Sequence, residues 1–95
     1  MADVGTKVIF EDDEIKVWNL IIDPGETSGL HTHNHNYFYY VVEGTTLEIH
    51  RENGMVNTVT MRSGEVVSGT EGSTHNAKNV GDTRFRNVLV EVKTS

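Results

Sequence analysis

The segment Pro24–Gly44, with the sequence PGETSGLHTHNHNYFYYVVEG, places three histidines at alternating positions directly before a run of aromatic residues. These histidines are His31, His33 and His35. In an extended strand successive side chains point to opposite faces, so residues two apart lie side by side, about 6.5–7 Å apart along the strand. His31 and His33 can therefore reach one metal ion, because imidazole is a common protein ligand for zinc, iron, copper and nickel.

A site of this kind takes its third ligand from another part of the fold. The two histidines outside the segment are His50 and His75. His75 stands among turn-forming residues in the glycine-rich stretch 64–79, whereas His50 belongs to the run TLEIHRE and shares a strand face with Glu48. We therefore predict His75 as the third ligand and His50 as a solvated surface residue.

Composition limits the kind of protein this chain can be. At 95 residues it is about the length of one small domain, and we expect residues 1–95 to form a single domain. The absence of cysteine excludes disulfides, thiolate metal ligands and a cysteine nucleophile, so a metal site must use nitrogen and oxygen ligands. The net charge of −6 argues against a nucleic-acid partner, because neutralising phosphates requires clustered lysine and arginine.

The sequence also lacks the patterns that indicate a membrane partner. No apolar run approaches the roughly 20 residues that span a bilayer. The first residues, MADVGTKVIF, do not combine a basic region with a long apolar stretch. We therefore expect a soluble protein of the cytoplasm.

The spacing of turn signals predicts an all-β fold. Turn-forming residues recur about every eight to twelve positions, and short runs of β-branched and aromatic residues lie between them. No long segment has the apolar spacing of an amphipathic helix. The predicted strands of an antiparallel barrel or sandwich cover residues 7–10, 15–22, 37–42, 45–51, 55–61, 65–68, 75–79 and 84–92.

The strand predicted over residues 37–42 is apolar or aromatic on both faces. An antiparallel strand with this pattern needs cover on both sides. One face points into the barrel, while the face with Phe38, Tyr40 and Val42 needs a second sheet or a partner subunit. We therefore expect a homodimer.

The histidine segment resembles the first motif of the cupin family. That motif consists of a glycine, five residues, His-x-His, three or four residues, a glutamate, six residues and a glycine. Gly25, His31, His33 and Gly44 stand at this spacing.

The glycine-rich stretch resembles the second cupin motif, which follows the first in the same order as in the family. It consists of a glycine, five residues, Pro-x-Gly, two residues, a histidine, three residues and an asparagine. Gly64, Gly72, His75 and Asn79 match these positions, and Thr70 replaces the usual proline. Together the two motifs make this resemblance specific, and the chain is about one minimal cupin domain long.

The resemblance implies a cupin-type antiparallel β-barrel, also described as a jelly-roll sandwich. It implies that His31, His33 and His75 surround one divalent ion, which can be Fe, Zn, Ni, Mn or Cu, with Fe or Zn favoured. We also expect Gly44 and Gly72 to adopt positive φ, where a β-carbon would be penalised.

One position departs from the family pattern. Tyr37 stands where the motif has its glutamate, and Phe38 occupies the alternative spacing. The resemblance therefore implies three neutral imidazoles, which keep the full charge of the metal and leave two or three positions for water, dioxygen or a chelating substrate. In this respect the site is similar to that of three-histidine iron cupins that act as dioxygenases.

Tyr37 and His35 are the candidate catalytic residues. The phenol of Tyr37 either donates a hydrogen bond to bound oxygen or fills the volume left by the glutamate. His35 has the same parity as His31 and His33, and it is a proton shuttle, a fourth ligand or a histidine at the rim. His35 lies at the rim if the chain turns between the two motif strands.

Several functions are compatible with this site. The first is a metal-dependent dioxygenase acting on a small organic substrate. The alternatives are a non-catalytic cupin that binds a metal or small molecule, an isomerase or lyase that uses the same ligands, and a cupin that has lost its metal. Arg84 and Arg86 form either a clamp for a carboxylate or a solvated strand end.

Overall fold

The computed structural model describes residues 1–94 and contains only β-strands as regular elements in that range. The strands are β1 (Lys7–Glu11), β2 (Ile15–Ile22), β3 (His31–Thr32), β4 (Asn36–Glu43), β5 (Thr46–Arg51), β6 (Val56–Thr60), β7 (Val66–Gly69), β8 (Thr74–Asn79) and β9 (Phe85–Val92). Each strand expected from the sequence is present, and the all-β prediction is confirmed. Among the described residues, no helix has the length and apolar character needed to cross a membrane.

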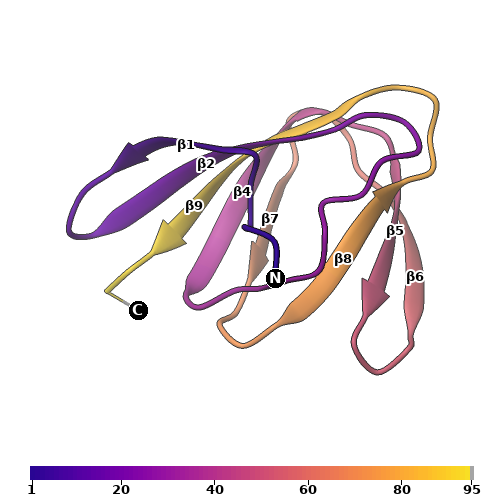
Figure 1. The fold of residues 1–95 in the computed structure, drawn as a ribbon. Coiled ribbons are helices and arrows are strands. Elements are labelled where there is room, and N and C mark those ends of the chain that lie inside the picture. The colour runs from indigo at the N-terminus through magenta and orange to yellow at the C-terminus, as the bar shows by residue number, and fades with distance from the viewer. Residues whose placement is uncertain (95) are drawn as a thin grey trace.

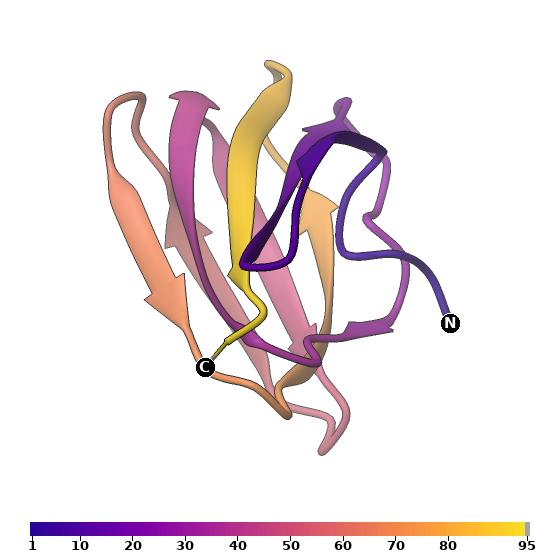
Figure 2. The ribbon, with the colours of Figure 1, turned by 90° about the vertical axis from the view of Figure 1, so that its left-hand side faces the viewer.

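The strands form two sheets that face each other. The first has five strands in the order β1-β2-β9-β4-β7, and the second has four in the order β3-β8-β5-β6. In Figure 1 the five-stranded sheet lies on the left and β8, β5 and β6 lie on the right. Figure 2 views the molecule from the side of the five-stranded sheet, with the other sheet behind it. This is the antiparallel jelly-roll arrangement expected from the resemblance.

The two-residue period of the strands decides which side chains enter the space between the sheets. Along β9 the buried residues are Phe85, Asn87, Leu89 and Glu91, and the residues between them are partly buried. The inward residues of both sheets build the main apolar core, which contains Leu20, Ile22, Val41, Leu47, Met61, Ala77 and Phe85.

The opposite face of the five-stranded sheet is also apolar. Phe38 is 42% exposed, Tyr40 48% and Val66 65%. Directly paired residues share a face, so the register places valines of β2 and β9 beside them. We call this surface the outer face, and its residues are Val17, Phe38, Tyr40, Val66, Val88 and Val90. The homodimer expected from this pattern stays a prediction.

The two motif glycines with expected positive φ differ. Gly72 has a φ of +88°, as predicted. The prediction for Gly44 is wrong, because Gly44 is not among the residues with positive φ. A Cβ on Gly44 would instead collide with the backbone carbonyl of Met61, so glycine is needed there for close approach of two chain segments.

Candidate metal centre

Pairing between β3 and β8 brings the two cupin motifs together. His31 lies directly opposite His75, and Thr32 lies opposite Thr74. The backbone of His33 continues the pairing beyond β3, because its N–H donates to the carbonyl of Ser73 at 2.9 Å. The extended conformation therefore continues past the end of the strand and points both His31 and His33 inward.

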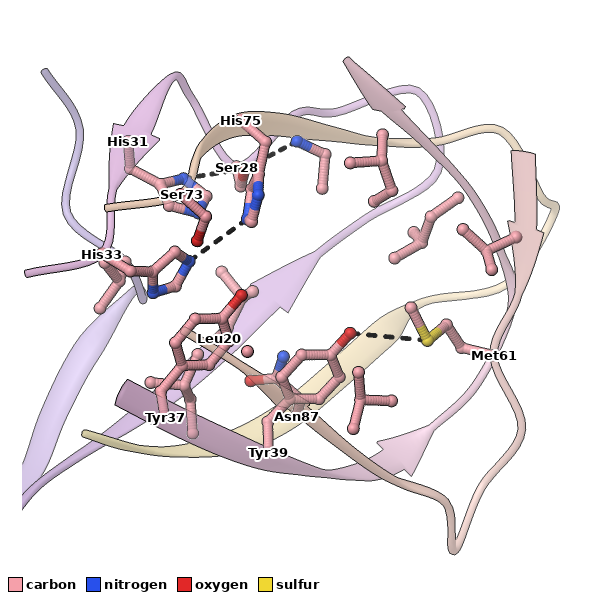
Figure 3. Close-up of a pocket in the computed structure, with 18 of the residues that line it drawn as sticks. Leu20, Ser28, His31, His33, Tyr37, Tyr39, Met61, Ser73, His75 and Asn87 are labelled. Atoms are coloured by element: carbon pink, nitrogen blue, oxygen red, sulfur yellow. Dashed lines mark hydrogen bonds between the residues drawn. The ribbon is translucent and has the colours of Figure 1, made fainter. Parts of the chain in front are cut away.

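The three predicted ligands converge at one end of the space between the sheets. One ligand nitrogen from each of His31, His33 and His75 lies within 4.8 Å of the others. The Nε2 atoms of His33 and His75 are 3.2 Å apart (Figure 3). Two nitrogens bound to one metal at about 2.0–2.1 Å lie roughly 3.0–3.4 Å apart, so this pair fits a shared ion.

The protonation of these histidines also fits a metal. The Nδ1 of His31 lies 2.8 Å from the carbonyl oxygen of Gly29, which can only accept, so Nδ1 carries the proton and the lone pair of Nε2 is left to bind a metal. Burial, with smaller contributions from the neighbouring histidines, lowers the pKa of His33 to about 3. Burial likewise lowers the pKa of His75 to about 4 and moves the pKa of His31 below its usual value. All three rings are therefore neutral near pH 7, the form that binds metals.

The remaining ring nitrogens argue against a purely structural cluster. The Nδ1 atoms of His33 and His75 are buried and have no hydrogen-bond partner among the described residues. Buried polar side chains that serve a structural role are normally hydrogen-bonded. The 3.2 Å contact between the two Nε2 atoms joins the rings to each other, and it has the spacing of two metal ligands.

Tyr37 lies against one of the ligand rings. Its ring stacks on His33 with a centroid distance of 3.8 Å and an angle of 15° between the planes. It packs in a second apolar cluster with Val4, Trp18 and Leu89. Tyr37, at the sequence position of the motif glutamate, therefore places an aromatic ring rather than a carboxylate beside His33.

The opposite strand is adapted to this tyrosine. Tyr37 pairs with Gly69 of β7, and a Cβ on Gly69 would collide with the Tyr37 ring. The glycine therefore makes room for the aromatic side chain.

The histidines open onto a cavity of about 400 Å³ between the two sheets. Most of its lining is apolar, with polar groups near the histidines, and Arg51 is the charged side chain among its lining residues in the described part of the chain. Figure 3 shows Tyr37 beside His33, and Asn87 and Tyr39 further from the histidines. Leu20, Ile22, Leu47, Ile49, Met61, Ala77, Phe85 and Leu89 also line it.

His35 lies apart from the three converging histidines. The chain bends at Asn34 and His35 before β4 begins, so the alternation of an extended strand stops there. His35 lines a different pocket of about 260 Å³ together with Trp18, Glu91 and Lys93. The structure therefore places His35 outside the main cavity, and its catalytic role stays a prediction.

The other histidine is a surface residue, as expected. The Nε2 of His50 lies 3.0 Å from a carboxylate oxygen of Glu48, and its side chain is 43% exposed. Arg84 and Arg86 also bind the protein's own side chains. Arg84 donates to Asp23 at 2.7 Å, and Arg86 donates to Asn19 at 2.8 Å.

Sequence reasoning missed two polar residues of the cavity, Arg51 and Asn87. Arg51 ends β5 opposite His75, and Asn87 occupies an inward position of β9. The alternation within RFRNVLVEV contains the signal for Asn87, because an amide stands there at a position of core parity. Nothing in the sequence alone brings either residue into the cavity that the histidines line.

Comparison with known proteins agrees with the fold. A cupin domain from Bordetella pertussis Tohama I is 28% identical, with a TM-score of 0.85, and the match covers 92% of this chain and 90% of that one. An uncharacterised conserved protein with a double-stranded β-helix domain from Klebsiella pneumoniae is 26% identical, with a TM-score of 0.74 and coverages of 90% and 73%.

The polyketide cyclase RemF from Streptomyces resistomycificus shares the fold, at 19% identity and a TM-score of 0.65, over 86% of this chain and 56% of that one. No curated protein sequence matches significantly. The family profile described as Cupin domain matches residues 18–91, which is most of the chain. The chain therefore belongs to the cupin family.

Proposed function

We propose that this protein is a metal-dependent enzyme that holds one divalent ion with His31, His33 and His75 and acts on a small organic molecule. The reaction we favour is dioxygenation with Fe(II). The observation that carries the proposal is the convergence of three neutral imidazoles, within 4.8 Å of one another, at the end of a cavity of about 400 Å³.

The chain's own residues support this role in three ways. The carbonyl of Gly29 fixes the tautomer of His31, and stacking on Tyr37 holds the ring of His33. The mostly apolar lining of the cavity suits the hydrocarbon part of a small organic molecule. The third support is electrostatic: no carboxylate is among the described lining residues, so the positive charge of the ion is not offset by the protein.

A bound Fe(II) would supply redox chemistry with dioxygen and a positive charge that holds a chelating substrate. The hydroxyl of Tyr37 is available for a hydrogen bond to the substrate, because the residue lines the cavity. The same ligands would equally serve zinc, with the protein acting as a lyase, an isomerase or a non-catalytic binding protein.

A metal titration with a matched pair of variants tests the metal site. His75→Ala removes a ligand from the cluster, whereas His50→Ala removes an exposed histidine paired with Glu48. Calorimetry with Zn²⁺ should give about one ion per chain for the wild type and His50→Ala, and affinity at least about 100-fold weaker for His75→Ala. Equal affinities in the two variants would show that the metal binds elsewhere.

A second measurement separates the enzyme from the alternatives. Protein loaded anaerobically with Fe(II) is exposed to air together with candidate chelating substrates, and oxygen uptake is followed with an electrode. Uptake that depends on both substrate and His75 supports a dioxygenase. Tight metal binding without any oxygen uptake contradicts the dioxygenase and leaves the non-redox alternatives.

A further inference from the structure

Asn87 is a buried amide without a visible structural purpose. It lies in the middle of β9, is 2% exposed, and its Oδ1 atom has no hydrogen-bond partner among the described residues. The residues paired with it on the neighbouring strands are Leu20 and Val41, which are both apolar and buried. An apolar side chain would suit this position better, because burying an unpaired amide opposes folding.

The other fully buried asparagine provides a direct comparison. The Nδ2 of Asn79 donates to the carbonyls of Ile22 at 2.9 Å and Thr83 at 2.8 Å, and its Oδ1 accepts from the N–H of Gly81 at 2.9 Å. Asn79 therefore braces the chain, as a structural amide does. Asn87 has no such network, so its amide is available to a bound molecule.

The position of Asn87 in the cavity indicates where that molecule lies. Asn87 lines the cavity, and Figure 3 places it between Tyr37 and Tyr39, across from the three histidines. The hydroxyl of Tyr39 already donates to the sulfur of Met61 at 3.7 Å. Asn87 is therefore a polar group that is free to recognise a ligand across the cavity from the histidines.

Charge at the other end favours an anion. Arg51 is the charged side chain among the described lining residues, and it lies directly opposite His75 in the pairing of β5 with β8. Its Nε atom donates to Asn57 at 3.4 Å, which leaves the terminal nitrogens of the guanidinium for a carboxylate. The apolar residues between Arg51 and Asn87 fit a hydrocarbon body.

We propose that the cavity binds a hydroxy carboxylate with a short apolar body. The carboxylate lies at the histidines and Arg51, and the hydroxyl lies at Asn87. A hydroxyl both donates and accepts, so it satisfies the Oδ1 and Nδ2 atoms of one amide. The inference names the substrate class of the proposed function and rests on that function for the metal end of the site.

Pairs of probes test this assignment. The probes are straight-chain ω-hydroxy carboxylates of three to seven carbons, each matched with the unsubstituted carboxylate of equal length. Affinities are measured by calorimetry with Zn²⁺-loaded wild type, Asn87→Leu and Arg51→Gln. The wild type should prefer the hydroxy member of at least one pair by about tenfold, as expected for one buried hydrogen bond.

The two variants should respond differently. Asn87→Leu removes the amide and keeps the branched shape of the side chain, so the preference for the hydroxyl should disappear or reverse. Arg51→Gln should weaken the binding of both members of a pair by the same factor, so the ratio of their affinities should not change. Asn87→Leu should also raise the melting temperature by about 4 °C or more, because it removes an unpaired buried amide.

The other possible results of these measurements overturn the proposal or test it separately from the metal site. An equal hydroxyl preference in wild type and Asn87→Leu, or no binding of any probe by the wild type, overturns the proposal. If Asn87→Leu does not fold, Asn87→Ala replaces it, and failure of both to fold makes the amide a structural requirement, which also overturns the proposal. A failure of the metal site is seen separately, as the absence of Zn²⁺ uptake. In that case the affinity ratios of the probe pairs are measured on metal-free protein, and they still decide the role of Asn87.

Discussion

The two faces of β4 consist of nearly the same residue types and have different environments. On the inner face Tyr37 is 9% exposed and Val41 is fully buried, whereas on the outer face Phe38 is 42% and Tyr40 is 48% exposed. Tyr37 stacks on His33 of the histidine cluster, and Tyr37 and Tyr39 line the cavity. The outer residues lie on an open apolar sheet. The period of the strand therefore assigns alternate residues to the cavity side and to an exposed apolar surface.

Burial also changes the chemistry of a phenol on the inner face. Burial raises the pKa of the Tyr39 hydroxyl above its usual value, with smaller contributions from Tyr37 and Glu65. Tyr39 therefore stays protonated and donates to Met61. The comparison shows that the environment of a face, rather than the residue type, decides what an aromatic side chain does here.

The largest effect should come from placing a charge on each face at adjacent positions. Val41→Asp buries a carboxylate at a position with 0% exposure, which we expect to cost about 4 kcal/mol or more and to unfold most of the protein. Tyr40→Asp, one residue earlier and 48% exposed on the outer face, should keep a cooperative thermal transition. Circular dichroism melts of both variants check this, and similar melting curves would contradict the assignment of the faces.

A smaller effect is expected at the outer face. Tyr40→Asp introduces a charge into the proposed subunit contact, so light scattering at micromolar concentration should change from the dimer mass to the chain mass. Thr58→Asp, at an exposed position of β6 in the other sheet, should leave the mass of the dimer unchanged. A wild type that is already monomeric would contradict the homodimer, and a Tyr40→Asp dimer would place the contact elsewhere.

The most informative change on the inner face is at Tyr37. Tyr37→Glu restores the family pattern but removes a stacked ring, so the metal-free protein should lose about 2–3 kcal/mol of stability. Zn²⁺ should then raise its melting temperature more than that of the wild type, because the carboxylate becomes an additional ligand. Oxygen uptake should fall, because the added negative charge weakens binding of an anionic substrate.

Tyr37→Phe is the control for this change. It keeps the ring on His33, so stability should change by less than about 1 kcal/mol and metal affinity should be nearly unchanged. Activity should fall only if the hydroxyl donates to the substrate. If Tyr37→Glu loses stability without gaining any response to Zn²⁺, Tyr37 serves only to pack the core.

The structure agrees with sequence predictions that depend on local patterns. Strand positions follow from alternation and turn residues, so β2 and β9 were predicted closely. β3 was not predicted as a separate element, because a two-residue strand carries no pattern of its own. Gly44 was misinterpreted since its requirement comes from the carbonyl of Met61, a residue distant in the sequence.

The spacing of the two motifs in the sequence was sufficient to select His31, His33 and His75, because ligands at fixed intervals on paired strands meet for any chain with this topology. The tertiary structure decided what surrounds them. His35 shares their parity yet leaves the cavity through a bend of the chain, and Tyr37 stacks on His33 because Gly69 on another strand leaves room for it. Asn87 on β9 and Arg51 on β5 line the same cavity because strand pairing and the packing of the two sheets bring these strands together. Such contacts join residues far apart in the sequence, so local sequence patterns do not predict them.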